Sequence, residues 1–241
     1  MLIFKDSKAA LIIGISIIIA AIIAGSFFYL AKQPQKTIKV VGIASEPYVS
    51  DIIKFSISLE ENTDPDNLKS GHEKLESQRK NLYLLLEKIG INAEDIHKKP
   101  IEVFREFEYN NGNRTFVAYR LNQNFYIVSK KIQQIEELAY NPVEFLNNDI
   151  YIRNLDLQYF YSGIDRLKKD LVAKATANAR ERANKMLENT DVKVGKALSL
   201  RSGVFQITEP LSTNVSSSGI YNTNSKEKQI SVTAHATFEI K

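Results

Sequence analysis

The sequence contains no cysteine and only three histidines. Disulfide frameworks, thiolate zinc sites and cysteine nucleophiles are therefore excluded, and the fold must be stabilised by packing. His72, His97 and His235 are far apart, on an expected helix, loop and strand, without the close spacing of a zinc motif. Gly-rich phosphate loops and the Gly-x-Ser-x-Gly elbow are also absent. We therefore expect no catalytic residue, no cofactor and no metal site.

Residues of one charge do not form a long run anywhere in the sequence. The 32 Lys and Arg residues and the 28 Asp and Glu residues are interspersed, at a sequence pI near 9.0. This composition predicts a mildly basic surface, and we expect no nucleic-acid partner. The adjacent pairs Glu60–Glu61 and Glu136–Glu137 do not predict an acid/base site, because neighbouring residues of a strand or helix point to different sides.

One long apolar run lies near the N-terminus. Residues Ala9 to Leu30 are uncharged, and a helix of this length spans the roughly 30 Å hydrocarbon layer. A membrane span and a signal peptide are the two interpretations. The run exceeds the ~7–15 residues of a signal h-region, and residues 27–30 continue it past the small residues 24–26. We therefore expect an uncleaved anchor.

The flanking lysines do not orient this run, because Lys5 and Lys8 precede it and Lys32, Lys36 and Lys39 follow it. A short N-terminal tail (1–8) followed by most of the chain is nevertheless the layout of a signal anchor that exports its C-terminal part. We expect a single-pass protein whose soluble part faces the periplasm or cell exterior. The tether 31–36 is too short to hold a domain far from the lipid, so this part begins near Thr37.

The first segments of the soluble part alternate between strand and helix patterns. Period-two spacing predicts strands over 37–43 and 52–60, with a turn at 44–51 between them. A helix is predicted from Asp66 to Ile89, with Gly90 as its C-cap. Its seven-residue repeat could indicate a coiled coil. A helix packed on a sheet is favoured, because the repeat covers only three intervals and strands flank it.

The middle of the soluble part predicts a hairpin, a second helix and a strand. Residues 101–109 and 116–128 form the two hairpin strands, because Asn111-Gly112 offers the positive-φ turn that tight hairpins need. The second helix (130–140) stops before Asn141, and Pro142 can begin a further turn. A strand then covers 150–159.

A long helix is predicted from Ile164 to Leu187. Its apolar stripe has four-residue spacing and consists of Leu167, Leu171, Ala175, Ala179, Ala183, Met186 and Leu187. Its opposite side is rich in Lys and Arg, diluted by acidic and amide residues. A nucleic-acid surface and a solvated face are the alternatives. We favour the solvated face, because the helix has no stacking aromatics.

Two strands and a long connection complete the chain. The strands cover 192–200 and 228–241, and the second alternates strictly at Ile230, Val232, Ala234, Ala236 and Phe238. The elements together predict an α+β fold, a mixed or antiparallel sheet with packed helices, in the order β-β-α-β-β-α-β-α-β-β after one N-terminal transmembrane helix.

The connection from Arg201 to Lys228 exceeds the ~2–5 residues that a hairpin requires. One interpretation is a flexible loop. The other is an oligomer contact, in which Phe205, Ile207, Ile220 and Tyr221 dock on a neighbouring subunit, because an extended edge with apolar side chains is a template for pairing. We take the second as our working hypothesis.

Several segments in order resemble the SIMPL-domain family. They are "IKVVGIASEPYVSDIIKFSISLE", "LLLEKIGINAEDI", "LVAKATANARERANKMLENTDVKVGKALSL" and "GVFQITEP…SSSGIYNTNSKEKQISVTAHATFEI". The tyrosine-containing "YFYSGIDRLK" before the alanine-rich helix is similar to the membrane-anchored bacterial branch. The family's Gly-x-Gly after the first strand is Gly42-Ile43-Ala44 here, and its Pro-Asp pair is spread to Pro47 and Asp51.

The resemblance implies one SIMPL-like α+β domain over 37–241, anchored in a bacterial cell membrane by 9–30. It also implies an extracytoplasmic protein of a family in which some members form ring-like or channel-like oligomers and links to oxidative-stress tolerance are proposed. No catalytic residue transfers. We expect a non-enzymatic homo-oligomeric assembly or interaction module, with an envelope protein as a further partner. The alternative is a periplasmic domain that binds a small molecule or peptide.

Overall fold

The computed structural model describes residues 7–31, 36–110 and 112–241. Helix α1 (Ser7–Ala31) contains the whole apolar run, and its segment Leu11–Tyr29 is long and apolar enough to cross a membrane. None of that segment is buried against the rest of the chain. By length and composition alone it could be a membrane anchor or a signal sequence. Most of the predicted tail and tether lies outside the described residues.

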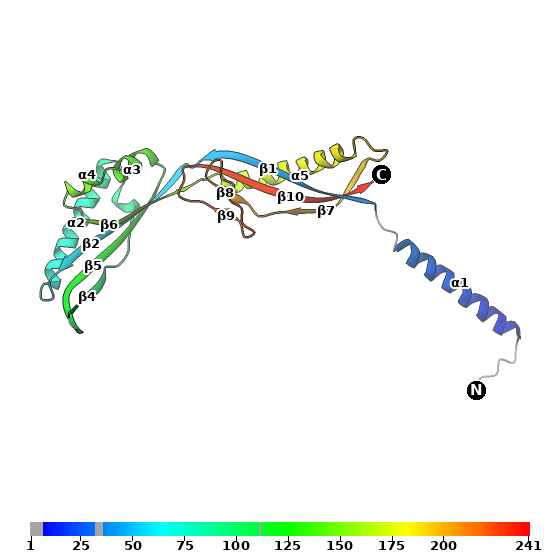
Figure 1. The fold of residues 1–241 in the computed structure, drawn as a ribbon, viewed down its shortest axis with the longest axis horizontal. Coiled ribbons are helices and arrows are strands. Elements are labelled where there is room, and N and C mark those ends of the chain that lie inside the picture. Colours follow the sequence, from blue (N-terminus) through cyan, green and yellow to red (C-terminus); the bar gives the residue numbers. More distant parts are fainter. Residues whose placement is uncertain (1–6, 32–35, 111) are drawn as a thin grey trace, which may run out of the picture.

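The soluble part is α+β, as predicted, and it contains two sheets with separate cores. Figure 1 shows these sheets end to end along the long axis of the molecule, each with its own helices. We call the half that holds Thr37 the proximal lobe and the other half the distal lobe. The chain enters the distal lobe after Val49, and it returns to the proximal lobe after Phe160.

The proximal lobe is a sheet covered on one face by a helix. Its longest strands, β1 and β10, pair antiparallel along the whole of β1, from Thr37 opposite Glu239 to Val49 opposite Glu227. The strict alternation of β10 places its apolar side chains on the buried face. The elements of this lobe are β1 (Thr37–Val49), α5 (Ile164–Leu187), β7 (Val194–Ser202), β8 (Gln206–Thr208), β9 (Ile220–Tyr221) and β10 (Glu227–Ile240).

Helix α5 packs directly on this sheet, as its alanine stripe predicts. Leu171, Ala175, Ala179 and Ala183 are all fully buried. A Cβ added at Gly42 of β1 would lie 2.1 Å from the carbonyl oxygen of Ala175 and 2.4 Å from the backbone nitrogen of Ala179. Small residues on both elements therefore set the close approach of helix and strand.

The distal lobe packs three helices on one face of an antiparallel sheet. Strand β2 lies at its centre, between β5 and β6. The 3-10 turn η1 (Ala93–Asp95) leads from the helix that follows β2 to the short edge strand. The other elements are β2 (Ile52–Thr63), α2 (Leu68–Lys88), β3 (Ile96–Lys98), β4 (Glu102–Asn110), β5 (Asn113–Ser129), α3 (Ile132–Ala139), α4 (Pro142–Leu146) and β6 (Ile152–Phe160).

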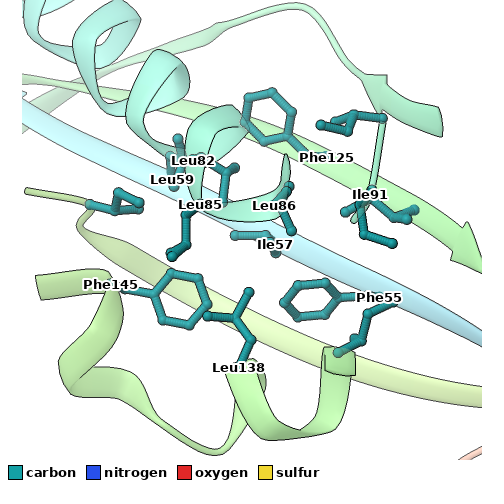
Figure 2. Close-up of a cluster of buried hydrophobic side chains, with 14 of the residues drawn as sticks. Phe55, Ile57, Leu59, Leu82, Leu85, Leu86, Ile91, Phe125, Leu138 and Phe145 are labelled. Atoms are coloured by element: carbon teal, nitrogen blue, oxygen red, sulfur yellow. The ribbon is translucent and has the colours of Figure 1, made fainter. Parts of the chain in front are cut away.

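Alternate residues of β2 form the distal core. In Figure 2, Phe55 and Ile57 of the strand lie between the leucines of α2 and the side chains of α3 and α4. Leu82 and Leu86 are fully buried there. The predicted helix-on-sheet arrangement is confirmed, and Gly90 ends α2 with φ +82°, a conformation that glycine adopts without a Cβ penalty.

Four expectations are wrong in detail. The turn predicted at 44–51 is much shorter, because β1 continues to Val49. Met186 does not close the buried stripe of α5, since it is 63% exposed. His97 lies on the short strand β3 and not in a loop. The connection after β7 also contains two short strands that pair in parallel, β8 and β9, which the predicted order lacks.

Candidate functional site

A two-stranded ribbon extends from the distal lobe. Strand β5 pairs with β2 only as far as Tyr119, which lies opposite Thr63. Residues 113–118 of β5 therefore pair with β4 alone. We call residues Glu102–Arg120 the distal arm. Figure 1 shows it at the end of the molecule farthest from Thr37. An isolated two-stranded ribbon is at best marginally stable in water, and this one is joined to the distal sheet only at its base.

The predicted hairpin turn closes the arm. Gly112 has φ +82°, the left-handed conformation that the Asn-Gly turn requires, and Asn110 lies opposite Asn113. Asn111 lies outside the described residues. A register shift between Glu106 and Phe107 adds one residue to β5, so Phe107 lies opposite Phe116.

One face of the arm carries arginines and aromatic rings. The guanidinium carbon of Arg114 lies 3.7 Å from the ring centre of Phe107, and that of Arg105 lies 6.0 Å from the ring of Phe116. Tyr109 is 70% exposed. Among the described residues, Arg105 and Arg114 form no ion pair. We call this the basic face, formed by Arg105, Phe107, Tyr109, Arg114 and Phe116.

The opposite face of the arm is acidic. Alternate residues of β4 place Glu102, Glu106 and Glu108 there, because side chains alternate along a strand. Arg120 lies on this face and pairs with Glu106 at 3.0 Å. Its guanidinium carbon is 5.4 Å from the ring of Phe104, which is 41% exposed. We call this the acidic face, formed by Glu102, Phe104, Glu106, Glu108 and Arg120.

A second polar cluster joins the two lobes. Backbone hydrogen bonds cross this junction from Tyr159 N–H to the carbonyl of Thr223 (2.7 Å) and from Ser50 N–H to the carbonyl of Lys226 (2.9 Å). The Asp51 carboxylate accepts hydrogen bonds from the N–H and hydroxyl of Ser162. Partial burial opposes ionisation of Asp51, but these hydrogen bonds outweigh it and lower the pKa of the carboxyl.

Lys228 lies buried in the junction. Its side chain is 1% exposed, and its ammonium group donates to the carbonyl oxygen of Tyr159. Burial lowers the pKa of Lys228 to about 8. Beside it, Glu136 accepts hydrogen bonds from the Tyr159 hydroxyl (2.8 Å) and from the ammonium of Lys226 (2.9 Å). A substrate cannot reach the Lys228 amine without opening the junction, so the cluster acts as a structural link.

The four predicted oligomer contacts lie together at the proximal sheet. Ile207 is 1% exposed and packs in the core of this chain, so it is removed from the surface that a neighbouring subunit could touch. Phe205 packs partly against the same core. Ile220 and Tyr221 form β9, where Tyr221 remains 46% exposed. The contact between subunits itself stays a prediction.

The adjacent glutamates and the histidines considered as catalytic or metal-binding candidates do not form a common site. Glu60 pairs with Arg153 and Glu61 with Lys74, on different sides of β2. The ring of His97 stacks on Tyr126, with ring centres 4.7 Å apart. Across the described residues, His, Asp and Glu side chains nowhere gather in a group of three that could hold a metal ion.

A shallow polar groove lies on the open face of the distal sheet. Its volume is about 310 Å³, and polar side chains of β2, β5 and β6 line it. Ser58 lies opposite Asn124 on one side and Asn154 on the other, and Lys54 and Lys99 border the groove. Such a surface can hydrogen-bond a small polar molecule, but it is too open to enclose one as a catalytic pocket does.

The arm was not predicted as a site, although its two-faced pattern is present in "EVFREFEY". Glutamates occupy even positions there and Arg105, Phe107 and Tyr109 occupy odd positions, so a strand must separate them onto two faces. The sequence does not reveal that, in the described part of the chain, this portion of the hairpin pairs with no third strand.

A comparison with curated proteins finds no match. A comparison with protein families matches residues 38–238 to the family described as "SIMPL: Protein of unknown function (DUF541)". The match covers both lobes, the arm and the junction. The chain therefore belongs to the SIMPL family.

Proposed function

We propose that this protein is a non-enzymatic, membrane-anchored assembly module of the bacterial envelope, and that its distal arm is the surface through which it assembles. The observation that carries the proposal is the arm itself. It is an aromatic and arginine-rich ribbon that pairs with no third strand over the described residues 106–110 and 112–118. Tyrosine, phenylalanine and arginine are the side chains enriched at the centres of protein interfaces.

The anchor in this proposal is α1. Its apolar segment is unburied, so it is available to lipid. The proposal places the two lobes, which follow α1, in the periplasm or at the cell exterior. With α1 in the membrane, copies diffuse in one plane, which raises their effective concentration for one another. The arms then stand at similar heights above the lipid, where contact between them is favoured.

The experiment compares the mass of the full chain in mild detergent with that of two variants. In the arm variant, an Asn-Gly turn replaces residues 106–118 and joins Arg105 to Tyr119, which already lie opposite each other. In the matched control, a Gly-Ser linker replaces the loop residues 212–218. We expect the native chain and the control to form a high-mass species by mass photometry, and the arm variant to lose it.

Two results would contradict the proposal. A native chain that stays monomeric at all concentrations would exclude self-assembly. Loss of mass in the loop control, with the arm variant unchanged, would move the contact to the 205–221 segment. Capture of a different envelope protein by the native arm alone would keep the arm as an interaction surface but replace the second copy by that partner.

Ligand binding in the polar groove is a second candidate function. The side chains that favour it are Ser56, Ser58, Asn124 and Asn154, which present hydroxyl and amide groups on one open face. A small polar ligand should raise the melting temperature of the native chain, and Ser58→Val should abolish that shift. A library of small polar molecules and short peptides that leaves the melting temperature unchanged would argue against this function.

A further inference from the structure

We infer that the distal arm of one copy binds the arm of a second copy head to tail, with the basic face of one arm on the acidic face of the next. This inference rests on the proposed self-assembly of the chain, and it names the partner and the geometry of the contact. It is carried by a charge pattern that differs between the two faces of a single ribbon.

The two faces are complementary in charge. The basic face holds Arg105 and Arg114 and no carboxylate. On the acidic face, Glu102 and Glu108 form no ion pair with any described residue, and Glu106 is matched by Arg120. Contact between opposite faces therefore places two unpaired arginines near two unpaired glutamates. Contact between like faces places like charges together, which disfavours that arrangement.

The apolar groups are distributed in the same way. Phe107, Phe116 and Tyr109 lie on the basic face, and Phe104 lies among the glutamates of the acidic face. Each face can therefore supply an apolar centre with a charged rim, which is the usual composition of a protein interface. Because the two surfaces in contact are different, the interface is heterologous, and each copy keeps one free face for a further copy.

Other partners fit this surface less well. A lipid surface does not explain this pattern, because the arm lies at the end of the molecule farthest from Thr37, which begins the first strand after α1. An anionic partner such as nucleic acid would meet the three glutamates on one of the two faces. A second copy is the partner that uses both faces at once.

The test reverses the charge of each face separately. Variant one carries Arg105→Glu and Arg114→Glu, and variant two carries Glu106→Arg and Glu108→Arg. Each variant alone then has two faces of the same sign. We expect each to dissociate at a concentration at least about tenfold higher than the native full chain in mild detergent, as measured by mass photometry. A control with Lys80→Glu and Lys88→Glu on α2 changes the same number of charges and should leave the mass unchanged.

The decisive sample is an equal mixture of the two variants. The reversed face of variant one is then complementary to the reversed face of variant two, and their native faces also remain complementary. Head-to-tail contact predicts that the mixture regains the native mass. Native melting temperatures for both variants would show that the charge reversals leave the two cores folded, because the four substituted residues lie outside them.

The outcomes separate this inference from the proposed function. If both variants keep the native mass, or if both lose it and the mixture does not recover, head-to-tail contact is excluded. In either case the arm remains the assembly surface, provided that replacing residues 106–118 still lowers the mass. If that replacement changes nothing, the proposed function fails together with the inference.

Discussion

The substitution Ala179→Leu tests how closely α5 approaches the proximal sheet. Ala179 has no exposed surface, and its backbone nitrogen would lie 2.4 Å from a Cβ built on Gly42. Strand and helix backbones are therefore in contact, and no space remains for the three additional carbons of leucine. Overpacking of this kind costs roughly 1–3 kcal/mol, and we expect Ala179→Leu to reach the upper part of that range.

Thermal unfolding of the full chain in detergent measures this cost. For a soluble part of this size, each kcal/mol lowers the melting temperature by about 2–4 °C. The matched control is Ala177→Leu, because Ala177 lies on the exposed side of the same helix. Leucine and alanine both favour helix, so the control should unfold close to the native temperature. Equal melting temperatures for the two variants would refute the assignment of the buried face.

Three further predictions concern the junction, the turn after α2 and the membrane. Because burial lowers the pKa of Lys228 to about 8 from 10.5, the unfolded chain binds this proton more tightly between these pH values. The native chain minus the Lys228→Met variant gives a difference in free energy of unfolding that should therefore rise between pH 8 and pH 10.5. A difference that does not change with pH would indicate that the Lys228 amine is exposed to water. Gly90→Ala should lower the melting temperature by forcing alanine to φ +82°, and calorimetry that finds no loss would contradict the turn geometry. Protease added to intact spheroplasts should digest the two lobes, whereas digestion only after lysis would reverse the proposed orientation.

Local patterns in the sequence predicted the elements well where one face is buried. The bounds of α5 and the buried alternation of β10 agree with the structure, because a single face of each packs against a core. The turn predicted at 44–51 was wrong in extent, because β1 continues through Pro47 to Val49. As β1 is an edge strand, the missing N–H of Pro47 costs no ladder hydrogen bond.

Local sequence patterns do not predict which strands pair when they are far apart in the sequence. No short segment indicates that Thr37 lies opposite Glu239, or that β1 and β2 belong to different sheets. The same limit applies to the site. The Asn-Gly turn predicted the hairpin, but its exposure depends on β2 ending at Thr63, and the burial of Ile207 depends on α5 and β10 packing around it.

Crosslinking between single cysteines tests the central claim most directly, because the native chain contains no cysteine. Glu108→Cys places a thiol on the acidic face of the arm, and Tyr109→Cys places one on the basic face. A bismaleimide with a reach of about 10 Å matches the spacing of packed sheets. The account predicts covalent dimers when the two variants are mixed in one membrane, and few when either is treated alone. Equal crosslinking of each variant alone, or none in the mixture, would contradict head-to-tail assembly through the distal arm.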